Sequence, residues 1–155
     1  MEPETQPETR LHGRILGLDV GDRRIGLAIS DELGLTAQPV LTLERKNRRH
    51  DFRFLVRMIR KYGCTQVVVG NPLYMSGDVS PQALKAQAFA QALESEAGVG
   101  VTLWDERLST TEAHRHLDAA GHLPGKRRAV IDQVAAVLIL QSFLDAHRGQ
   151  WLAGE

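Results

Sequence analysis

After a polar start, the chain carries two short runs of apolar, β-prone residues separated by a charged turn. These runs, Ile15–Gly21 and Ile25–Ser30, flank Asp22-Arg23-Arg24, a pattern typical of two antiparallel strands joined by a tight hairpin. A third run, Ala37–Leu43, contains Pro39, and proline suits an edge strand or a bulge because it has no backbone N–H. This part of the chain therefore predicts three antiparallel strands.

The period of the apolar residues becomes helical after the third strand. It predicts a helix over Arg48–Tyr62, with Gly63 as a stop signal. The β-branched run Thr65–Gly70 predicts a strand covered on both faces, and Ser80 followed by proline predicts the start of a helix that continues to about Glu96. The remaining expected elements are a strand at Val101–Arg107, a helix from Ser109 to about Ala120 and a helix from about Ala129 to Ala146.

Three antiparallel strands followed by alternating helices and strands indicate an α/β domain, with helices on the faces of a mixed sheet. A length of 155 residues with 43% hydrophobic content fits one such domain. We expect it to span residues 13–148, between a disordered tail at 1–12 and a C-terminal tail at 149–155. The first tail has acids and prolines and lacks the apolar run of a signal peptide.

Composition narrows the class of protein further. The single cysteine, Cys64, excludes an internal disulfide and a cysteine metal cage, which favours a reducing cytoplasm. The longest apolar run, Val134–Leu140, is far shorter than the roughly 18 residues of a membrane span, so no membrane partner is expected. Acidic and basic residues cancel at 19 each, but eight of the basic ones lie between Arg45 and Lys61.

Part of that basic concentration forms a stripe on the helix predicted at 48–62. Arg49, Arg53, Arg57 and Arg60 are spaced by four, four and three residues, which places them along one helical face. A charged stripe is usually a solvated surface, and it also suits contact with a nucleic-acid backbone. Both interpretations stay open from the sequence.

One carboxylate interrupts the apolar pattern of the first strand. By alternation, Asp19 shares a face with Gly17 and Gly21, and glycine in a strand permits close approach of a ligand or of another backbone. A carboxylate buried in a sheet is costly unless it is paired, hydrogen-bonded or bound to a metal. For Asp19 alone, an ion pair with Arg23 or Arg24 and a metal ligand are equally good interpretations.

Further carboxylates lie at the ends of other predicted elements. Asp105 and Glu106 end a strand, and Asp132 opens the last helix, where an acid also suits the helix dipole. Sites in α/β folds gather at the C-terminal ends of parallel strands, which the first turn of a final helix can reach. Converging carboxylates without histidine or cysteine suit Mg²⁺ or Mn²⁺, and two such ions about 3.5–4 Å apart would assist phosphodiester displacement.

Four segments resemble the YqgF/RuvX group of RNase H-like nucleases, which are relatives of the RuvC Holliday-junction resolvases. They are GLDVGDRRIGLAISD, VVVGNPLYMSG, WDERLSTTEA and IDQVAAVLILQSFLD, and the resemblance covers nearly the whole chain after the tail. It implies an RNase H-like fold with a mixed five-stranded sheet. It also implies Asp19, Glu106 and Asp132 as catalytic residues and metal ligands. The preference for Glu106 over Asp105 comes from the resemblance, because strand alternation cannot distinguish the two. One departure is Asn71, where the family usually carries leucine.

Basic residues accompany each acid of this set, and we expect them to contact phosphates while keeping the carboxylates ionised. The expected nucleic-acid-binding residues are Arg23, Arg24, Arg49, Arg53, Arg57, Arg107, Lys126, Arg127 and Arg128. For Arg107, an ion pair with its acidic neighbours is an equally good interpretation. The last three lie in a glycine-rich segment at 121–128 that predicts a mobile loop. Asp78, His114 and His116 suit capping and surface positions better than catalytic ones.

These observations predict a divalent-metal-dependent endonuclease that acts on structured nucleic acid. The resolvase side of the resemblance implies four-way DNA junctions cut by a homodimer, since two matched nicks need two sites. The ribosome-maturation side implies the 5′ end of pre-16S rRNA. The basic stripe and loop favour DNA junctions slightly, although RNA would use them equally. The alternative is a catalytically inactive nucleic-acid-binding or transcription-associated module, against which three acids facing a phosphate backbone argue.

Overall fold

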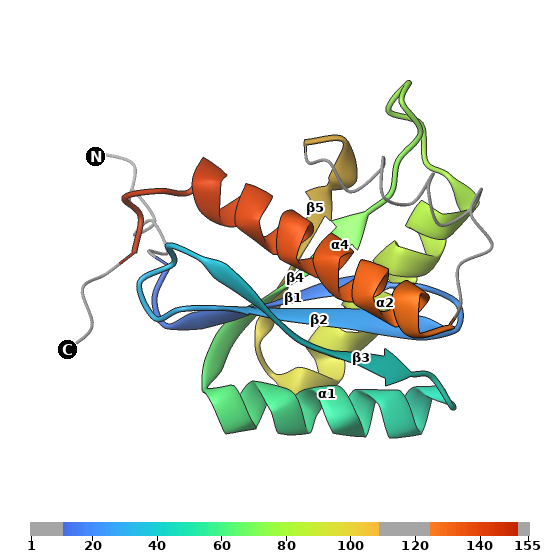
Figure 1. The fold of residues 1–155 in the computed structure, drawn as a ribbon, viewed down its shortest axis with the longest axis horizontal. Coiled ribbons are helices and arrows are strands. Elements are labelled where there is room, and N and C mark those ends of the chain that lie inside the picture. The colour runs from blue at the N-terminus through green and yellow to red at the C-terminus, as the bar shows by residue number, and fades with distance from the viewer. Residues whose placement is uncertain (1–10, 109–124, 152–155) are drawn as a thin grey trace, which may run out of the picture.

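The structure is a computed structural model that describes residues 11–108 and 125–151 (Figure 1). Most element bounds fall within a residue or two of those predicted, and the helix predicted from Ser109 to about Ala120 lies outside the described residues. The elements are β1 (Arg14–Val20), β2 (Arg24–Ser30), β3 (Ala37–Glu44), α1 (Arg48–Tyr62), β4 (Cys64–Asn71), α2 (Pro81–Ala97), β5 (Gly100–Asp105), the 3₁₀ turn η1 (Glu106–Leu108) and α4 (Gly125–Ala146).

The strands form one five-stranded sheet in the order β3-β2-β1-β4-β5. The pairs β1/β2 and β2/β3 are antiparallel and the pairs β1/β4 and β4/β5 are parallel, which confirms the predicted mixed sheet. The β1–β2 hairpin closes with a 2.9 Å bond from Gly21 N–H to the carbonyl of Arg24. Pro39 lies on the edge strand β3, opposite Ala28, where the register shifts, so proline occupies the kind of position predicted for it.

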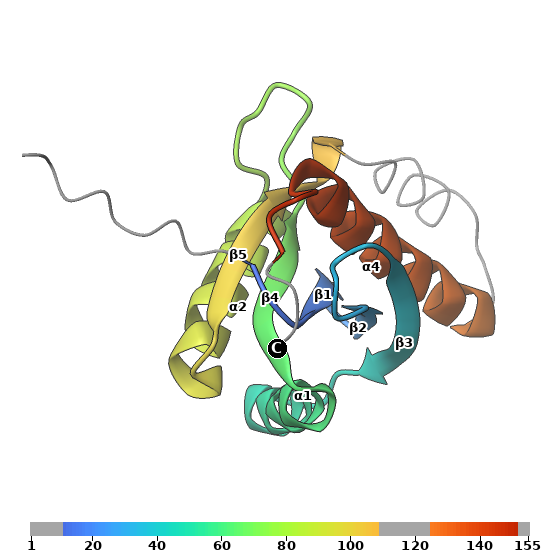
Figure 2. The same ribbon diagram turned by 90° about the vertical axis from the view of Figure 1, so that its left-hand side faces the viewer.

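The helices cover the two faces of the sheet unequally, with α1 and α2 on one face and α4 on the other (Figure 2). The connections β3–α1–β4 and β4–α2–β5 both cross in the same direction between parallel strands, and a common right-handed crossover puts both helices on the same face. Leu16 and Leu18 therefore pack towards α1 and α2, whereas Ile15 packs towards α4. Val67, Val68 and Val69 of β4 are fully buried, as predicted for a strand covered on both faces.

Local signals explain where α1 and α2 begin and end. The side chain of Asn47 accepts the N–H of His50 at 2.8 Å and caps α1, which stops at Gly63 in the left-handed conformation with φ of 64°. At α2, Ser80 Oγ accepts the N–H of Ala83 at 2.9 Å, and Pro81 follows as the first helical residue.

Helix α4 begins earlier than predicted. The predicted mobile loop at 121–128 is wrong for Gly125–Arg128, which form the first turn of the helix. Lysine and arginine are good helix formers, and here their propensity outweighs the glycine and proline signals around them. Asp132 consequently lies at the end of the second turn rather than in the first, so the helix-dipole interpretation of this acid no longer applies.

The composition of α4 also needs a correction. The 18 residues Ala129–Ala146 have a mean hydropathy of 1.6, so by length and composition alone this helix could cross a membrane, contrary to the expectation that no stretch comes near that limit. A third of this window is buried inside the domain. Ala136, Ile139 and Leu140 are fully buried against the sheet, so the position of α4 on β1, β2 and β3 accounts for its apolar character.

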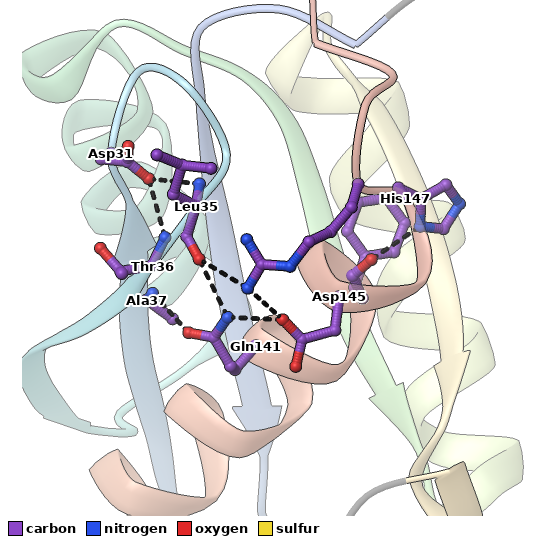
Figure 3. Close-up of polar contacts among 9 residues, drawn as sticks. Asp31, Leu35, Thr36, Ala37, Gln141, Asp145 and His147 are labelled. Atoms are coloured by element: carbon purple, nitrogen blue, oxygen red, sulfur yellow. Dashed lines mark hydrogen bonds and ion pairs between the residues drawn. The ribbon is translucent and has the colours of Figure 1, made fainter.

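A polar network fixes the C-terminal half of α4 to the β2–β3 turn (Figure 3). Gln141 accepts the N–H of Ala37 at 2.9 Å through Oε1 and donates to the carbonyl of Leu35 at 3.1 Å through Nε2. Within the turn, Asp31 Oδ1 accepts the N–H groups of Leu35 at 2.7 Å and Thr36 at 2.9 Å. The network sets the direction of α4 across the sheet, so the N-terminal half of the helix lies over the opposite end of β2.

Residues near both chain ends contact the domain. The indole of Trp151 lies against Gly34, whose φ of 67° and missing side chain leave room for it, and Trp151 Nε1 donates to the carbonyl of Gly13 at 3.1 Å. Leu11 forms a parallel bridge with Trp151. Leu11 and Trp151, both assigned to tails from the sequence, therefore pack against the folded domain.

Candidate active site

Asp19 lies near the C-terminal end of β1 on the face that α4 covers, and only 4% of it is exposed. A Cβ atom at Gly17, on the same face, would lie 2.7 Å from Leu140 Cβ, so this glycine lets α4 approach the strand. A Cβ atom at Gly21 would lie 2.9 Å from the carbonyl oxygen of Arg24, so Gly21 serves the hairpin turn. Of the two roles considered for these glycines, close backbone approach is the one observed.

Glu106 follows β5 as the first residue of η1, rather than ending the strand as predicted, and only 3% of it is exposed. Its carboxylate lies over Gly70 of β4, where a Cβ atom would be 2.6 Å from Glu106 Oε1. Leu18 pairs with Val69 in the β1–β4 ladder, so the next residues, Asp19 and Gly70, are neighbours across the two strands. Glu106 therefore lies beside Asp19 on the same face of the sheet.

Asp132 approaches from the other side of Asp19. The register partner of Asp19 on β2 is Gly26, and a Cβ atom there would clash with the carbonyl oxygen of Asp132. The Asp132 carboxylate accepts a 2.8 Å bond from Arg24 Nε, and both side chains are 16% exposed. Arg24 of β2 thus pairs with Asp132 of α4.

The three acids form a row across adjacent strands, which we call the acidic row. Glu106 lies over β4, Asp19 stands on β1, and Asp132 lies over β2. Residues from β1, η1 and α4, which are distant in sequence, thereby lie at one end of one face of the sheet. The sequence predicts that the three carboxylates share bound cations, and that role of the set stays a prediction.

The chemistry of this donor set fits a hard divalent cation, because carboxylate oxygens are the ligands that Mg²⁺ and Mn²⁺ prefer. Among residues 11–108 and 125–151, however, no three acidic, histidine or cysteine side chains come together closely enough to enclose an ion. Mg²⁺ is commonly held by one or two carboxylates, with waters and substrate phosphate supplying the other ligands. Asp19 and Glu106, the two buried acids of the row, suit that mode of binding.

Asp105 and Arg107 form a second, separate feature beside the row. Arg107 Nη2 donates to Asp105 Oδ2 at 2.7 Å, and Arg107 Nε lies 3.0 Å from the same oxygen. The hydrogen bond from the Arg107 side chain lowers the pKa of Asp105 from its ordinary value. The ion-pair interpretation of Arg107 is therefore the one observed.

Arg107 also holds the loop at 72–80. Its Nη1 donates to the carbonyl of Met75 at 3.2 Å, and Gly77, with φ of 92°, lies against the same guanidinium. The loop projects beyond the sheet next to the ends of β4 and β5 (Figures 1 and 2). Asp78 in this loop is exposed and accepts a 3.1 Å bond from Ser76 Oγ, so it makes a local bond.

The other predicted nucleic-acid-binding residues are distributed over both faces. Arg23 is exposed in the hairpin turn. The arginines of the α1 stripe, Arg49, Arg53, Arg57 and Arg60, are exposed on a helix that packs on the face opposite the acidic row. The stripe and the acids are therefore separated by the sheet. Lys126, Arg127 and Arg128 lie on the first turn of α4, and His114 and His116 fall outside the described residues.

Gly26 and Gly70 were not among the residues predicted for the site. Both are glycines inside strands, and both mark the places where an outer acid of the row lies against the sheet. Strand alternation together with strand pairing could have identified them. Once the strand order is known, both glycines lie on the same sheet face as Asp19.

The architecture is an RNase H-like fold of the RuvC type. A structure titled "T. thermophilus RuvC in complex with Holliday junction substrate" superposes with a TM-score of 0.55 at 16% identity, covering 90% of this chain and 98% of that one. The structure of fowlpox virus resolvase with Holliday junction DNA gives a TM-score of 0.52 at 14% identity, covering 86% and 97%. At these identities the likeness establishes the fold.

Sequence comparison establishes the family. The model of the family described as "RuvX: Holliday junction resolvase" matches residues 13–146. A relative from Syntrophus aciditrophicus named "Putative pre-16S rRNA nuclease" is 48% identical over 133 residues, which are 86% of this chain and 89% of the relative. A protein of the same name from Moorella thermoacetica is 48% identical over 132 residues, covering 85% and 94%. The chain belongs to the RuvX family, as its sequence motifs indicated.

Proposed function

We propose that this protein is a divalent-metal-dependent endonuclease that hydrolyses phosphodiester bonds in structured nucleic acid. The observation that carries the proposal is the acidic row. Asp19 and Glu106 are buried side by side at the end of the sheet, and Asp132 reaches the same face from α4. Burying carboxylates next to one another is costly, and a function that uses them justifies that cost.

The roles of the residues follow from their positions. Asp19 and Glu106 would hold Mg²⁺ or Mn²⁺, and a bound ion supplies an activated water and neutralises charge on the phosphate. Arg24 donates to the Asp132 carboxylate at 2.8 Å and so fixes the position of the third carboxylate. Arg107 anchors the projecting loop through Met75 and so shapes the edge of the site. Arg23, Lys126, Arg127 and Arg128 would supply cations for the substrate phosphates.

Pre-16S rRNA is the first candidate substrate, because relatives that are 48% identical over most of their length carry that name. A four-way DNA junction is the second candidate, supported by the family description and by the junction bound to the RuvC-type structure. Symmetric cleavage of a junction would also require two copies of the site, so the junction hypothesis includes a homodimer.

The test is cleavage of both substrates by one preparation in Mg²⁺, in Mn²⁺ and in EDTA. We expect cleavage with metal and none in EDTA. Asp19→Asn and Glu106→Gln should each lower the rate by about 100-fold or more, because each removes a ligand charge at the reacting centre. Glu32→Gln is the matched control, since Glu32 is 76% exposed and lies in the β2–β3 turn, at the end of β2 away from Gly26 and Asp132.

Three results would count against the proposal. Full activity of Asp19→Asn, or undiminished cleavage in EDTA, would mean that the acidic row takes no part in the reaction. Tight binding of either substrate without cleavage in both metals would instead favour the inactive binding module. Faster cleavage of the four-way DNA junction than of pre-16S rRNA would make the junction the first candidate substrate.

A further inference from the structure

A pocket of about 320 Å³ lies on the face of the sheet opposite the acidic row. It is formed where the β1–β2 hairpin meets the N-terminal end of α1 and the outer side of α2. Val20 and Gly21, which line it, directly follow Asp19 in the chain, at the end of β1. The pocket and the acidic row therefore share one end of β1 while opening on different faces.

The rim of the pocket is basic. Arg45, Arg48 and Lys85 line it, against the single acid Asp22. Arg45 is fixed, because its Nη1 donates to the Gly21 carbonyl at 2.8 Å and its Nε lies 3.3 Å from the buried carboxylate of Asp51.

The other two basic side chains of the rim are exposed. Arg48 is the first residue of α1, and its guanidinium lies 5.2 Å from the Phe52 ring, a contact that a phosphate would compete with. Lys85 pairs with Asp22 at 3.0 Å, but both side chains are more than half exposed, and ion pairs between exposed side chains are weak and easily exchanged.

The floor of the pocket is apolar and aromatic. Phe52 and Phe89 pack edge to face with ring centroids 5.0 Å apart, and the guanidinium of Arg45 lies 5.4 Å from the Phe89 ring. Ala88 and Ala92 line the side formed by α2, and their small side chains leave the space open. Both rings are buried, so the alanines supply the open part of this apolar floor. An apolar floor under a cationic rim suits a base that carries a phosphate.

We propose that this pocket binds one nucleotide, with its phosphate at Arg48 and Lys85 and its base over the apolar floor. A volume of about 320 Å³ is at the small end of ligand pockets, which suits one nucleotide rather than a longer segment. The inference rests on the proposed function for its choice of ligand, and it extends that function with a second binding position for a nucleic-acid strand, on the far face of the hairpin that carries Asp19.

Binding is measured in EDTA, so that cleavage does not enter, by NMR titration with AMP, adenosine and inorganic phosphate. Fluorescence anisotropy with a single-stranded RNA octamer at one fixed salt concentration adds the polymer. AMP should shift the amide signals of Gly21, Gln82 and Lys85, and adenosine or phosphate alone should shift them less. If the octamer binds more tightly than AMP, the source of the nucleotide is a strand. Equal affinity identifies a free nucleotide.

Four variants separate a binding pocket from a merely structural one. Arg48→Ala and Lys85→Ala should weaken AMP binding about 3- to 10-fold, and Ala88→Trp should weaken it more by filling the pocket without changing charge. Asp22→Asn should strengthen it, because Lys85 is then released to the phosphate. If the Lys85–Asp22 pair only stabilises the structure, Lys85→Ala and Asp22→Asn should instead have the same effect on AMP binding. Lys61→Ala, at the other end of α1, is the charge-matched control.

The proposal is overturned if AMP shifts none of these amides, if phosphate alone binds as well as AMP, or if all variants bind AMP like wild type. Its failure is distinguishable from failure of the nuclease assignment. An inactive protein whose pocket variants lose AMP binding retains the pocket and loses only the catalytic proposal. An active nuclease whose pocket variants all bind AMP like wild type retains the catalytic proposal and loses the pocket.

Discussion

Gly70 determines, at the scale of one residue, whether Glu106 can lie beside Asp19. A Cβ atom at this position would be 2.6 Å from Glu106 Oε1 and 2.6 Å from Ile139 Cδ1, so something must move when it is added. We expect Gly70→Ala to displace the carboxylate. Nuclease activity should fall by about 100-fold, since small misplacements of catalytic groups are costly, while the free energy of unfolding falls by only about 1–3 kcal/mol. Cleavage rates and urea unfolding measure the two effects.

Gly100→Ala is the matched control for that substitution. Gly100 opens β5, has no heavy atom within 4 Å of its Cβ position and does not need a left-handed backbone. Its activity and stability should equal those of the wild type. Wild-type activity in Gly70→Ala would mean that Glu106 does not need its observed place against β4.

Cys64 gives a second test at the residue scale. Burial raises the pKa of its thiol to about 11, so at pH 8 about one molecule in a thousand carries the reactive thiolate. We expect no reaction with a thiol reagent at pH 8 in the native protein, and rapid stoichiometric reaction after unfolding in urea. Fast labelling of the native protein would contradict the buried position at the start of β4.

The turn between β2 and β3 provides a prediction at the scale of elements. Burial alone would raise the pKa of Asp31, but N–H groups of Thr36, Leu35 and Leu33 bond to its carboxylate and together lower the pKa below its ordinary value of 3.8. A carboxyl whose pKa is lowered by folding stabilises the protein above that ordinary value, and this contribution is lost as the pH falls through the folded-state pKa.

We therefore expect Asp31→Asn to lower the free energy of unfolding by about 1 kcal/mol at pH 7, as suits hydrogen bonds at a largely solvated turn. The difference between variant and wild type should shrink as the pH falls below about 4. Urea unfolding at pH 7 and at pH 3 measures it. A difference that is equally large at pH 3 would show that the charge of Asp31 is not what orders the turn.

The same scale shows what could be predicted from the sequence. The strands were predictable because their alternation has a period of two and turn residues follow their ends, as Gly21 follows β1. The start of α4 was not, because glycine and proline around residues 121–125 suggest a loop, whereas basic residues of good helix propensity extend the helix to Gly125. As a result, the sequence placed Asp132 one turn too early.

At the scale of the whole molecule, the sequence motifs propose the three acids as candidates, but they do not give the positions of the cations. Whether the α1 stripe lies near the acidic row depends on which face α1 covers, and that follows from strand order and crossover hand. Neither is encoded in the spacing of the arginines. For the same reason the glycines at Gly26 and Gly70 acquire their meaning only when β4, β1 and β2 are placed side by side.

Binding of a divalent ion at the acidic row should also be visible in the stability of the entire domain, independently of activity. A ligand that binds only the native state raises the free energy of unfolding by RT ln(1 + [L]/Kd), about 1.4 kcal/mol at ten times Kd, which is a melting shift of a few degrees for a chain of this size. We expect Mg²⁺ or Mn²⁺ to produce this shift in the wild type and in Glu32→Gln.

Asp19→Asn should lose most of that shift, because it removes a buried carboxylate that would hold the ion. Melting curves in EDTA and in increasing Mg²⁺ compare the three proteins directly, and the slope of Tm against log [Mg²⁺] reports binding without any nucleic acid present. An equal slope in Asp19→Asn would place the stabilising ion away from the acidic row. The metal dependence of cleavage would then have to arise from ions bound to the substrate rather than from Asp19 and Glu106.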